Sequence, residues 1–258
     1  MNGDHTDIEL VEAAPITTSK VQLQPLPDFD FADPFIFSSE VIAAVLAFVV
    51  AFHFYRFYRM SGFVYLLGLV IGFSFITFAE VLLAVDVWLE FNPEIFNMLF
   101  WMRLLSLSYG FSFLAVSYYY KHREEDKTPW MMRIGALSVI PITIMIALVV
   151  ILPPAFDFPP YNQADEYFRV FNLVMLGYVF KSTLSSIVEQ GRKEFMYIPA
   201  AYAILWLGQY SALISSLELN VGAVIAQHIA KVTGLALFVT VLSQVMRLRK
   251  VARTETEA

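Results

Sequence analysis

The chain has 258 residues, of which 58% are hydrophobic and 16% charged, with a formal net charge of −6. A soluble domain carries about 25% charged residues, so this composition excludes an ordinary water-soluble globule, and its high hydrophobicity excludes a disordered chain. The absence of cysteine excludes disulfides, thiol catalysis and cysteine-based metal sites, and the lack of a basic tract excludes a nucleic-acid-binding surface.

Residues 1–34 form a polar, acidic segment with several prolines, and we expect an extracellular tail that is disordered because it has too few apolar residues for a core. Residues 35–247 contain recurring apolar stretches, each long enough for the ~20 residues that cross a bilayer. They lack the alternation of membrane barrel strands, so they predict an all-α integral membrane bundle. The seven expected transmembrane helices cover residues 39–57, 61–86, 95–120, 130–152, 166–189, 195–217 and 222–246. Residues 248–258 would form a short cytoplasmic tail.

Basic residues stay on the cytoplasmic side of short loops, and they therefore predict the orientation. Most of the 17 Lys and Arg residues follow the first, third, fifth or seventh span, among them Arg59, Lys121, Arg192 and Arg249. Most carboxylates, including Glu40, fall on the other side. We therefore expect a multi-pass protein of the cell membrane with its N-terminus outside and its C-terminus in the cytoplasm.

Three ionisable side chains stand out inside the predicted spans, where a charge costs roughly 2.5–3.5 kcal/mol: Glu80, Arg103 and Lys231. At ~1.5 Å per residue, Glu80 lies about 9 Å and Arg103 about 12 Å below the same boundary, so we expect an ion pair between their neighbouring helices. On the same scale Lys231 lies about 14 Å deep, and its own helix offers no carboxylate one turn away.

Further polar side chains lie at related depths. Gln227 and His228 are close to Lys231 in the last span, and Gln209 lies at a comparable depth in the sixth. We expect a shared polar chamber in the outer half of the bundle, formed by Glu80, Arg103, Gln209, Gln227, His228 and Lys231. A packing role is the alternative, because interhelical hydrogen bonds in membranes contribute about 0.6 kcal/mol on average and also fix helix positions.

The sequence shows no enzymatic constellation. Its four histidines lack metal-ligand spacing, and it contains neither HExxH nor a glycine-rich phosphate loop. We therefore expect a non-enzymatic, receptor-like or sensory protein that binds a small ligand or senses the bilayer, and that contacts a signalling partner through its basic inner loops. An accessory or structural subunit of a membrane complex is the other interpretation.

Residues 229–234 (IAKVTG), in the last helix of a seven-helix chain, are similar to the stretch around the retinal lysine of microbial rhodopsins. The resemblance implies a sensor or pump in which Lys231 binds retinal as a Schiff base, with Trp101 and Trp206 as pocket aromatics. The chain differs from that family in having Gln227 and Ser106 where aspartates are expected. Its topology also resembles the seven-helix sensor modules of prokaryotic histidine kinases, without an attached kinase.

Overall fold

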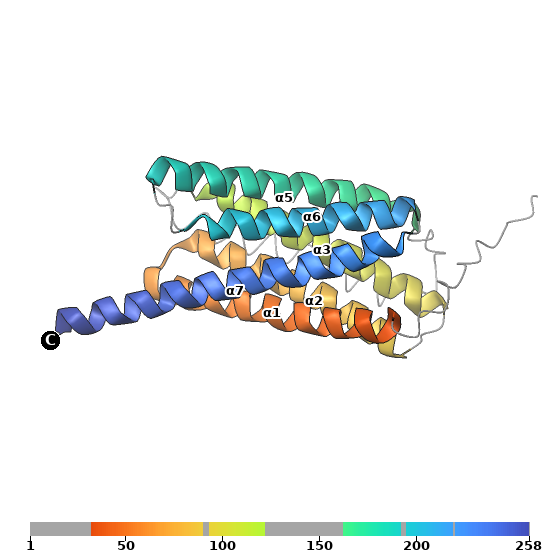
Figure 1. Ribbon diagram of the computed structural model, residues 1–258, viewed down its shortest axis with the longest axis horizontal. Helices are drawn as coiled ribbons and strands as arrows, with labels where there is room; N and C mark the ends of the chain where they lie inside the picture. Colours follow the sequence, from red (N-terminus) through yellow and green to blue (C-terminus); the bar gives the residue numbers. More distant parts are fainter. Residues whose placement is uncertain (1–31, 90–92, 122–161, 192–194, 219, 258) are drawn as a thin grey trace, which may run out of the picture.

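The computed structural model describes residues 32–89, 93–121, 162–191, 195–218 and 220–257. These residues form six helices (Figure 1): α1 (Ala32–Ser61), α2 (Val64–Leu89), α3 (Pro93–Tyr120), α5 (Asn162–Gln190), α6 (Tyr197–Leu217) and α7 (Val221–Glu257). All six are long and apolar enough to cross a membrane, so the expected all-α, multi-pass character is confirmed. The predicted span 130–152 and residues 1–31 of the predicted tail lie outside the described residues.

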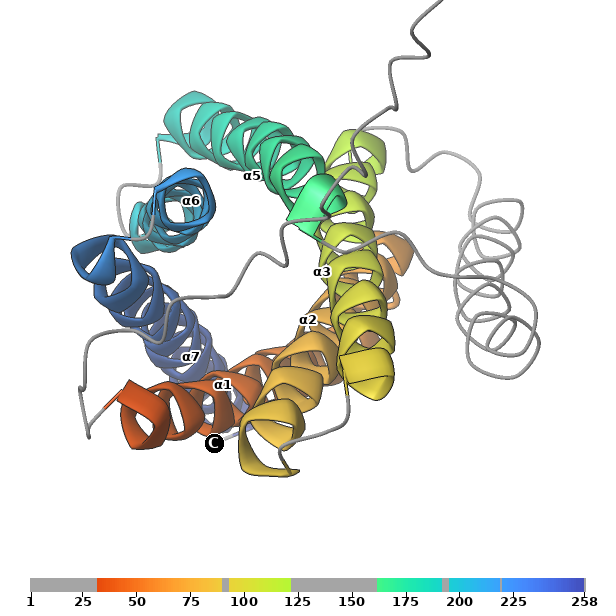
Figure 2. The same cartoon turned by 90° about the vertical axis from the view of Figure 1, so that its right-hand side faces the viewer.

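The six helices form a closed ring in chain order. Each helix contacts the next, and α7 returns to contact α1. Figure 2, which looks along the helices, shows this order around the ring. The helices α1, α3, α5 and α7 begin at one end of the ring, which we call the entry end, and finish at the other, the exit end (Figure 1). Both α2 and α6 run the opposite way.

The described helices place a constraint on the connection between α3 and α5. The helix α3 finishes at the exit end, whereas α5 begins at the entry end (Figure 1). The chain must therefore pass from one end of the ring to the other between α3 and α5. The predicted span 130–152 would meet this requirement. That crossing and the orientation of the termini stay predictions.

The helix boundaries differ from the expected ones mainly at the two ends of the chain. The first helix begins at Ala32, and α7 continues to Glu257, through the residues expected to form a tail. No Gly or Pro interrupts residues 248–257, and their Leu, Arg, Lys and Ala residues favour helix. At ~1.5 Å per residue, the 37 residues of α7 span about 56 Å, more than the ~30 Å hydrocarbon layer.

Two glycines mark helix ends at the exit end of the ring. Gly62 follows α1 with φ of 70°, and Gly191 follows α5 with φ of 65°. A left-handed residue directly after a helix is a common stop signal, and glycine adopts it without a steric penalty. The sequence therefore encodes these two turns locally.

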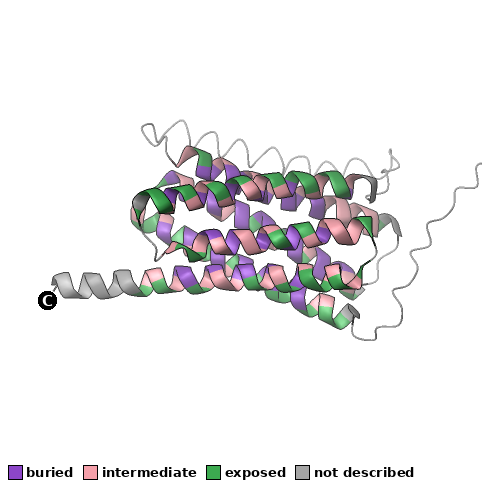
Figure 3. Ribbon diagram, turned by 45° about the horizontal axis from the view of Figure 1, so that its top comes forward, coloured by how far each residue is buried: buried purple, intermediate pink, exposed green. Residues whose placement is uncertain are grey.

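Buried and exposed residues alternate along each helix (Figure 3), and apolar side chains occur in both groups. Phe73, Leu114 and Phe238 are fully buried inside the ring, while Phe48 and Val174 are each 62% exposed on its outside. A helix that is hydrophobic all round is typical of a membrane span, where lipid covers the outer face.

Small residues allow two pairs of helices to approach closely. A Cβ atom added to Gly72 of α2 would lie 2.9 Å from the carbonyl oxygen of Gly110 in α3, and one added to Gly234 of α7 would lie 2.9 Å from Leu205 in α6. Small residues at such crossings are the usual packing device of membrane helices. These contacts hold α2 against α3, and α7 against α6, on either side of the site described below.

Candidate functional site: a buried ionic cluster and its cavity

Lys231 lies at the centre of a group of charged side chains from α1, α2 and α7. Its Nζ donates to Glu40 Oε1 at 2.6 Å, to Glu40 Oε2 at 2.7 Å and to Glu80 Oε2 at 2.8 Å. An ammonium group has three N–H donors, so these contacts engage its full donor capacity. Hydrogen bonds between two charged groups at such distances are among the strongest in proteins.

His228 continues this group toward the beginning of α1. Its Nδ1 lies 2.9 Å from Glu40 Oε1 and 2.9 Å from Ser39 Oγ. Because the Ser39 hydroxyl donates to the carbonyl of Ile36 at 2.8 Å, it presents an acceptor to the imidazole. This pattern favours the tautomer that carries its proton on Nδ1 and donates toward Glu40. We call Ser39, Glu40, Glu80, His228 and Lys231 the ionic cluster.

The ionic cluster is almost completely shielded from the surroundings. Glu40 is 0% exposed, Glu80 3% and Lys231 7%. Buried charges are tolerated when they are paired and hydrogen-bonded, as these are. The helices supply this pairing because α1 contacts both α2 and α7, and because His228 and Lys231, three residues apart, share one face of α7.

The ionic cluster differs from the expected pairing in two respects. No ion pair within 4 Å joins Glu80 to Arg103 in the described part of the chain, and Glu80 binds Lys231 instead. Glu40, which the charge pattern groups with the outer carboxylates, is buried and contributes two of the three acceptors around Lys231. The expected pairing was wrong because depth fixes the height of a side chain but not its direction around the helix axis.

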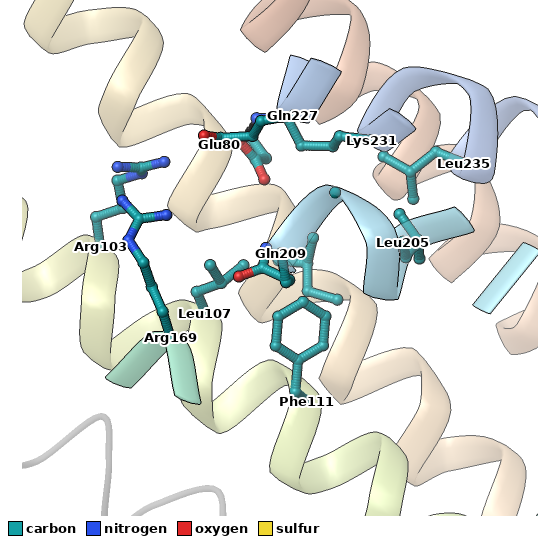
Figure 4. Close-up of a pocket in the computed structure, with 12 residues that line it drawn as sticks. Glu80, Arg103, Leu107, Phe111, Arg169, Leu205, Gln209, Gln227, Lys231 and Leu235 are labelled. Carbon is teal, nitrogen blue, oxygen red and sulfur yellow. Dashed lines mark hydrogen bonds and ion pairs between the residues drawn. The ribbon is translucent and has the colours of Figure 1, made fainter. Parts of the chain in front are cut away.

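A small cavity lies beside the ionic cluster, among α2, α3, α5, α6 and α7 (Figure 4). Its volume is about 20 Å³, whereas a water molecule needs about 10–15 Å³. Five of the predicted site residues line it, namely Glu80, Arg103, Gln209, Gln227 and Lys231. The sixth, His228, lies with Ser39 and Glu40 instead. The structure thus brings the predicted residues into one region, and their role stays a prediction.

Two arginines form part of the cavity wall. Arg103 of α3 is 8% exposed and packs over the ring of Phe100, with 5.7 Å from Cζ to the ring centroid. Arg169 of α5, which the charge pattern places on the outer side, also lines the cavity and pairs with Asp165 one turn earlier. Figure 4 shows both side chains extending into the same part of the site.

Sequence reasoning missed Ser39, Glu40 and Arg169. A usable signal existed for Glu40. It lies eight residues after the first residue of α1, and Lys231 lies ten residues after the first residue of α7. The two helices begin at the same end of the ring, so a depth comparison between the first and last spans would have matched this acid with this lysine. Ser39 and Arg169 carry no comparable signal, because each sits near an expected helix end.

The side chains of the ionic cluster can carry charge, and they can exchange protons with one another. Two carboxylates share one ammonium group, and the cavity is far smaller than the ~300–1,000 Å³ of typical small-molecule pockets. Among the residues that the structure describes, no group of three His, Asp or Glu side chains could hold a metal ion.

The aromatic residues suggested by the rhodopsin resemblance lie elsewhere. Trp206 Nε1 donates to the carbonyl of Leu173 at 3.1 Å, and Trp101 packs edge-on against Phe168. Neither belongs to the cavity wall. No family model matches the chain, and no curated protein or solved structure is similar to it.

Proposed function

We propose that this protein is a non-enzymatic, receptor-like or sensory membrane protein whose responsive element is the ionic cluster. The observation that carries the proposal is the network from Lys231 to Glu40 and Glu80, which ties three helices together at a buried position. Ionisable residues inside membrane spans are rare and commonly mark functional sites. Replacing a buried ion network with apolar side chains is often neutral or stabilising by about 1–4 kcal/mol, so packing alone is a weak reason for its presence.

The ionic cluster provides a physical basis for switching. Removing one partner of a buried ion pair costs about 3–5 kcal/mol, because the remaining charge is uncompensated. Reversing a two-state equilibrium from 1:99 to 99:1 needs about 5.5 kcal/mol, which is of similar size. A stimulus that alters the charge around Lys231 would therefore shift α7 relative to α1 and α2. The continuation of α7 to Glu257 would carry that movement to a cytoplasmic partner.

Distance measurement between spin labels tests this coupling. The chain has no cysteine, so labels attach only at introduced cysteines. We choose Val188 in α5 and Arg247 in α7, which are exposed near the exit end, far along each helix from the ionic cluster. Lys231→Met should change the distribution of distances between the labels, because α7 loses the Lys231 hydrogen bonds to Glu40 of α1 and Glu80 of α2.

Lys181→Met is the matched control, since Lys181 is an exposed lysine on α5. It should leave the distance distribution unchanged. An identical distribution in the Lys231→Met protein, with folding verified by circular dichroism, would reduce the ionic cluster to a packing contact and remove the sensory interpretation.

A retinal protein is the second candidate, and one observation favours it. Glu40 and Glu80 place carboxylates beside the Lys231 nitrogen, where a protonated Schiff base needs counter-ions. Two observations oppose it, because those carboxylates engage the nitrogen fully and the cavity of about 20 Å³ is too small for a polyene. Incubation with all-trans-retinal decides. A visible absorption band that disappears in Lys231→Ala supports this candidate, and the absence of a band removes it.

A further inference from the structure

More cationic than anionic side chains line the cavity beside the ionic cluster. Arg103, Arg169 and Lys231 line it, and Glu80 is the one carboxylate among the described residues that do so. Lys231 donates to both Glu40 and Glu80, so its charge is already compensated within the ionic cluster. Asp86, the other buried acid of α2, is not part of the wall. Arg103 and Arg169 are therefore the cationic side chains of the cavity wall that lie outside the ionic cluster.

Arg103 is the less satisfied of the two. Arg169 is bound by Asp165, whereas Arg103 forms no ion pair within 4 Å in the described part of the chain. Arg103 is 8% exposed, and its buried Nε has no hydrogen-bond partner among the described residues. Buried polar atoms without partners are uncommon in native proteins and call for an unseen partner.

Gln209 of α6, on another part of the cavity wall, also has a buried polar atom without a hydrogen-bond partner among the described residues. It is 9% exposed, and its buried Oε1 has no partner in the described residues. Carboxamide oxygen and nitrogen positions are exchangeable by a half-turn of the group. The same side chain can therefore present an NH₂ donor to a ligand in the cavity.

We propose that this cavity binds a small monovalent anion, held mainly by Arg103 and assisted by Arg169 and Gln209. The planar guanidinium group suits anions because its N–H donors are fixed in a fork and it stays charged. A volume of about 20 Å³ limits the ligand to the size of a halide or a very small carboxylate. A water molecule could satisfy Nε, but an anion would form a charge-assisted hydrogen bond with it, which is about twice as strong.

The inference deepens the proposed function, on which the anion's role as a stimulus rests. Glu80 is shared between the cavity and the ionic cluster. An anion beside Arg103 would weaken the attraction of that guanidinium for Glu80, and would leave Glu80 more firmly with Lys231. Occupancy of the cavity would therefore favour the form in which α2 and α7 are bonded.

Chloride-35 NMR of the full-length protein in detergent tests the site. Titrating chloride into a gluconate buffer of constant ionic strength should give saturable line broadening. We expect at least a tenfold loss of affinity in Arg103→Gln and a smaller loss in Arg169→Gln. Arg56→Gln, a change at an exposed arginine of α1, should leave the affinity unchanged. Arg103→Lys should be intermediate, because it keeps the charge without the fork.

Competition separates the two ligand sources. Displacement of chloride by bromide but not by formate assigns a halide site, whereas tighter displacement by formate assigns a small carboxylate. The absence of saturable broadening in the wild-type protein means that water fills the cavity, and it overturns the proposal. Unchanged affinity in a folded Arg103→Gln protein overturns it as well, because the anion then binds elsewhere.

Spin-label distances in the presence and absence of chloride separate this inference from the proposed function. A site that binds chloride without changing the distance between labels at 188 and 247 keeps the anion site and removes its sensory role. A distance that responds to Lys231→Met in a protein that binds no chloride removes the anion site alone.

Discussion

Glu80 pairs with Lys231 and not with Arg103, and this pairing defines the site. It lies 2.8 Å from Lys231 and forms no ion pair with Arg103 among the described residues. Glu40 supports this pairing, because its Oε1 lies 2.6 Å from the Nζ atom of the same ammonium group. Lys231 therefore links α2 to α1 through a single nitrogen atom, and the loss of any member should affect the other two.

This geometry predicts unequal coupling energies. In double-mutant cycles, Glu80→Gln combined with Lys231→Gln should show a coupling of about 1–3 kcal/mol, the range for residues in direct contact. Glu80→Gln combined with Arg103→Gln should couple less, because no direct contact joins that pair. The free energy of unfolding in mixed micelles measures both cycles. Equal couplings, or a stronger one for Arg103, would show that Glu80 turns toward α3.

The tautomer of His228 gives a second prediction at this scale. An asparagine amide places an N–H donor close to the position of Nδ1, whereas a glutamine amide reaches farther, toward Nε2. His228→Asn should therefore keep the contact with Glu40 and be more stable than His228→Gln by about 1 kcal/mol, the typical net value of a hydrogen bond. Thermal unfolding of the two variants provides the comparison, and the reverse order would assign the proton to Nε2.

Between helices, the crossing of α2 and α3 fixes the position of Glu80. A Cβ atom on Gly72 would approach the Gly110 carbonyl oxygen to 2.9 Å and Leu114 Cδ2 to 2.8 Å. Backbone cannot move away from such a contact as a flexible side chain does. Gly72→Ala should therefore destabilise the protein by about 1–3 kcal/mol, the usual cost of overpacking.

Gly177→Ala in α5 is the matched control for this change. Its nearest neighbour, Trp206 Nε1, would lie 3.6 Å from the new Cβ, which is ordinary contact. Alanine is the better helix former by about 1 kcal/mol, so this substitution should be neutral or stabilising. Similar losses in the two variants, measured by thermal unfolding, would show that the α2–α3 crossing is not tightly packed.

The helices themselves were predictable, because crossing a bilayer is a requirement on length and hydrophobicity alone. All six described helices overlap predicted spans. The partner of Glu80 was not predictable, unlike the match in depth between Glu40 and Lys231, since lipid leaves the outer face of each helix as apolar as the inner face. Phe48 and Phe73 look alike in the sequence, although one is 62% exposed and the other fully buried. Without a polar stripe, the rotation of each helix stays undetermined.

Across the whole molecule, the ionic cluster is separated from the exit end by an apolar layer. Leu235 and Phe238 follow Lys231 along α7 and are fully buried. The ring of Phe238 packs against Tyr202, with centroids 4.6 Å apart, and the hydroxyl of Tyr202 reaches that of Tyr118 at 3.3 Å. Under the proposed function, a change at the ionic cluster would therefore have to reach the exit end by helix movement.

The arrangement of the ring makes a prediction about the two sides of the membrane. Tyr167 and Val188 lie near opposite ends of α5 and are 78% and 66% exposed. Because the chain has no cysteine, a single cysteine at either position reports one side alone. A membrane-impermeant maleimide added to intact cells should label Tyr167→Cys, since basic residues gather at the exit end and the positive-inside rule predicts a cytoplasmic location for that end.

Val188→Cys should react only after the cells are made permeable, and Trp88→Cys should react like Tyr167→Cys. Trp88 is 72% exposed near the end of α2, which runs toward the entry end.

Agreement between positions 88 and 167 would place the entry ends of α2 and α5 on the same side. Since α3 runs from the entry end to the exit end, the chain must then cross the membrane once more before α5, which is the seventh crossing. Labelling of position 188 in intact cells would invert the orientation, and labelling of 88 without 167 would contradict the ring.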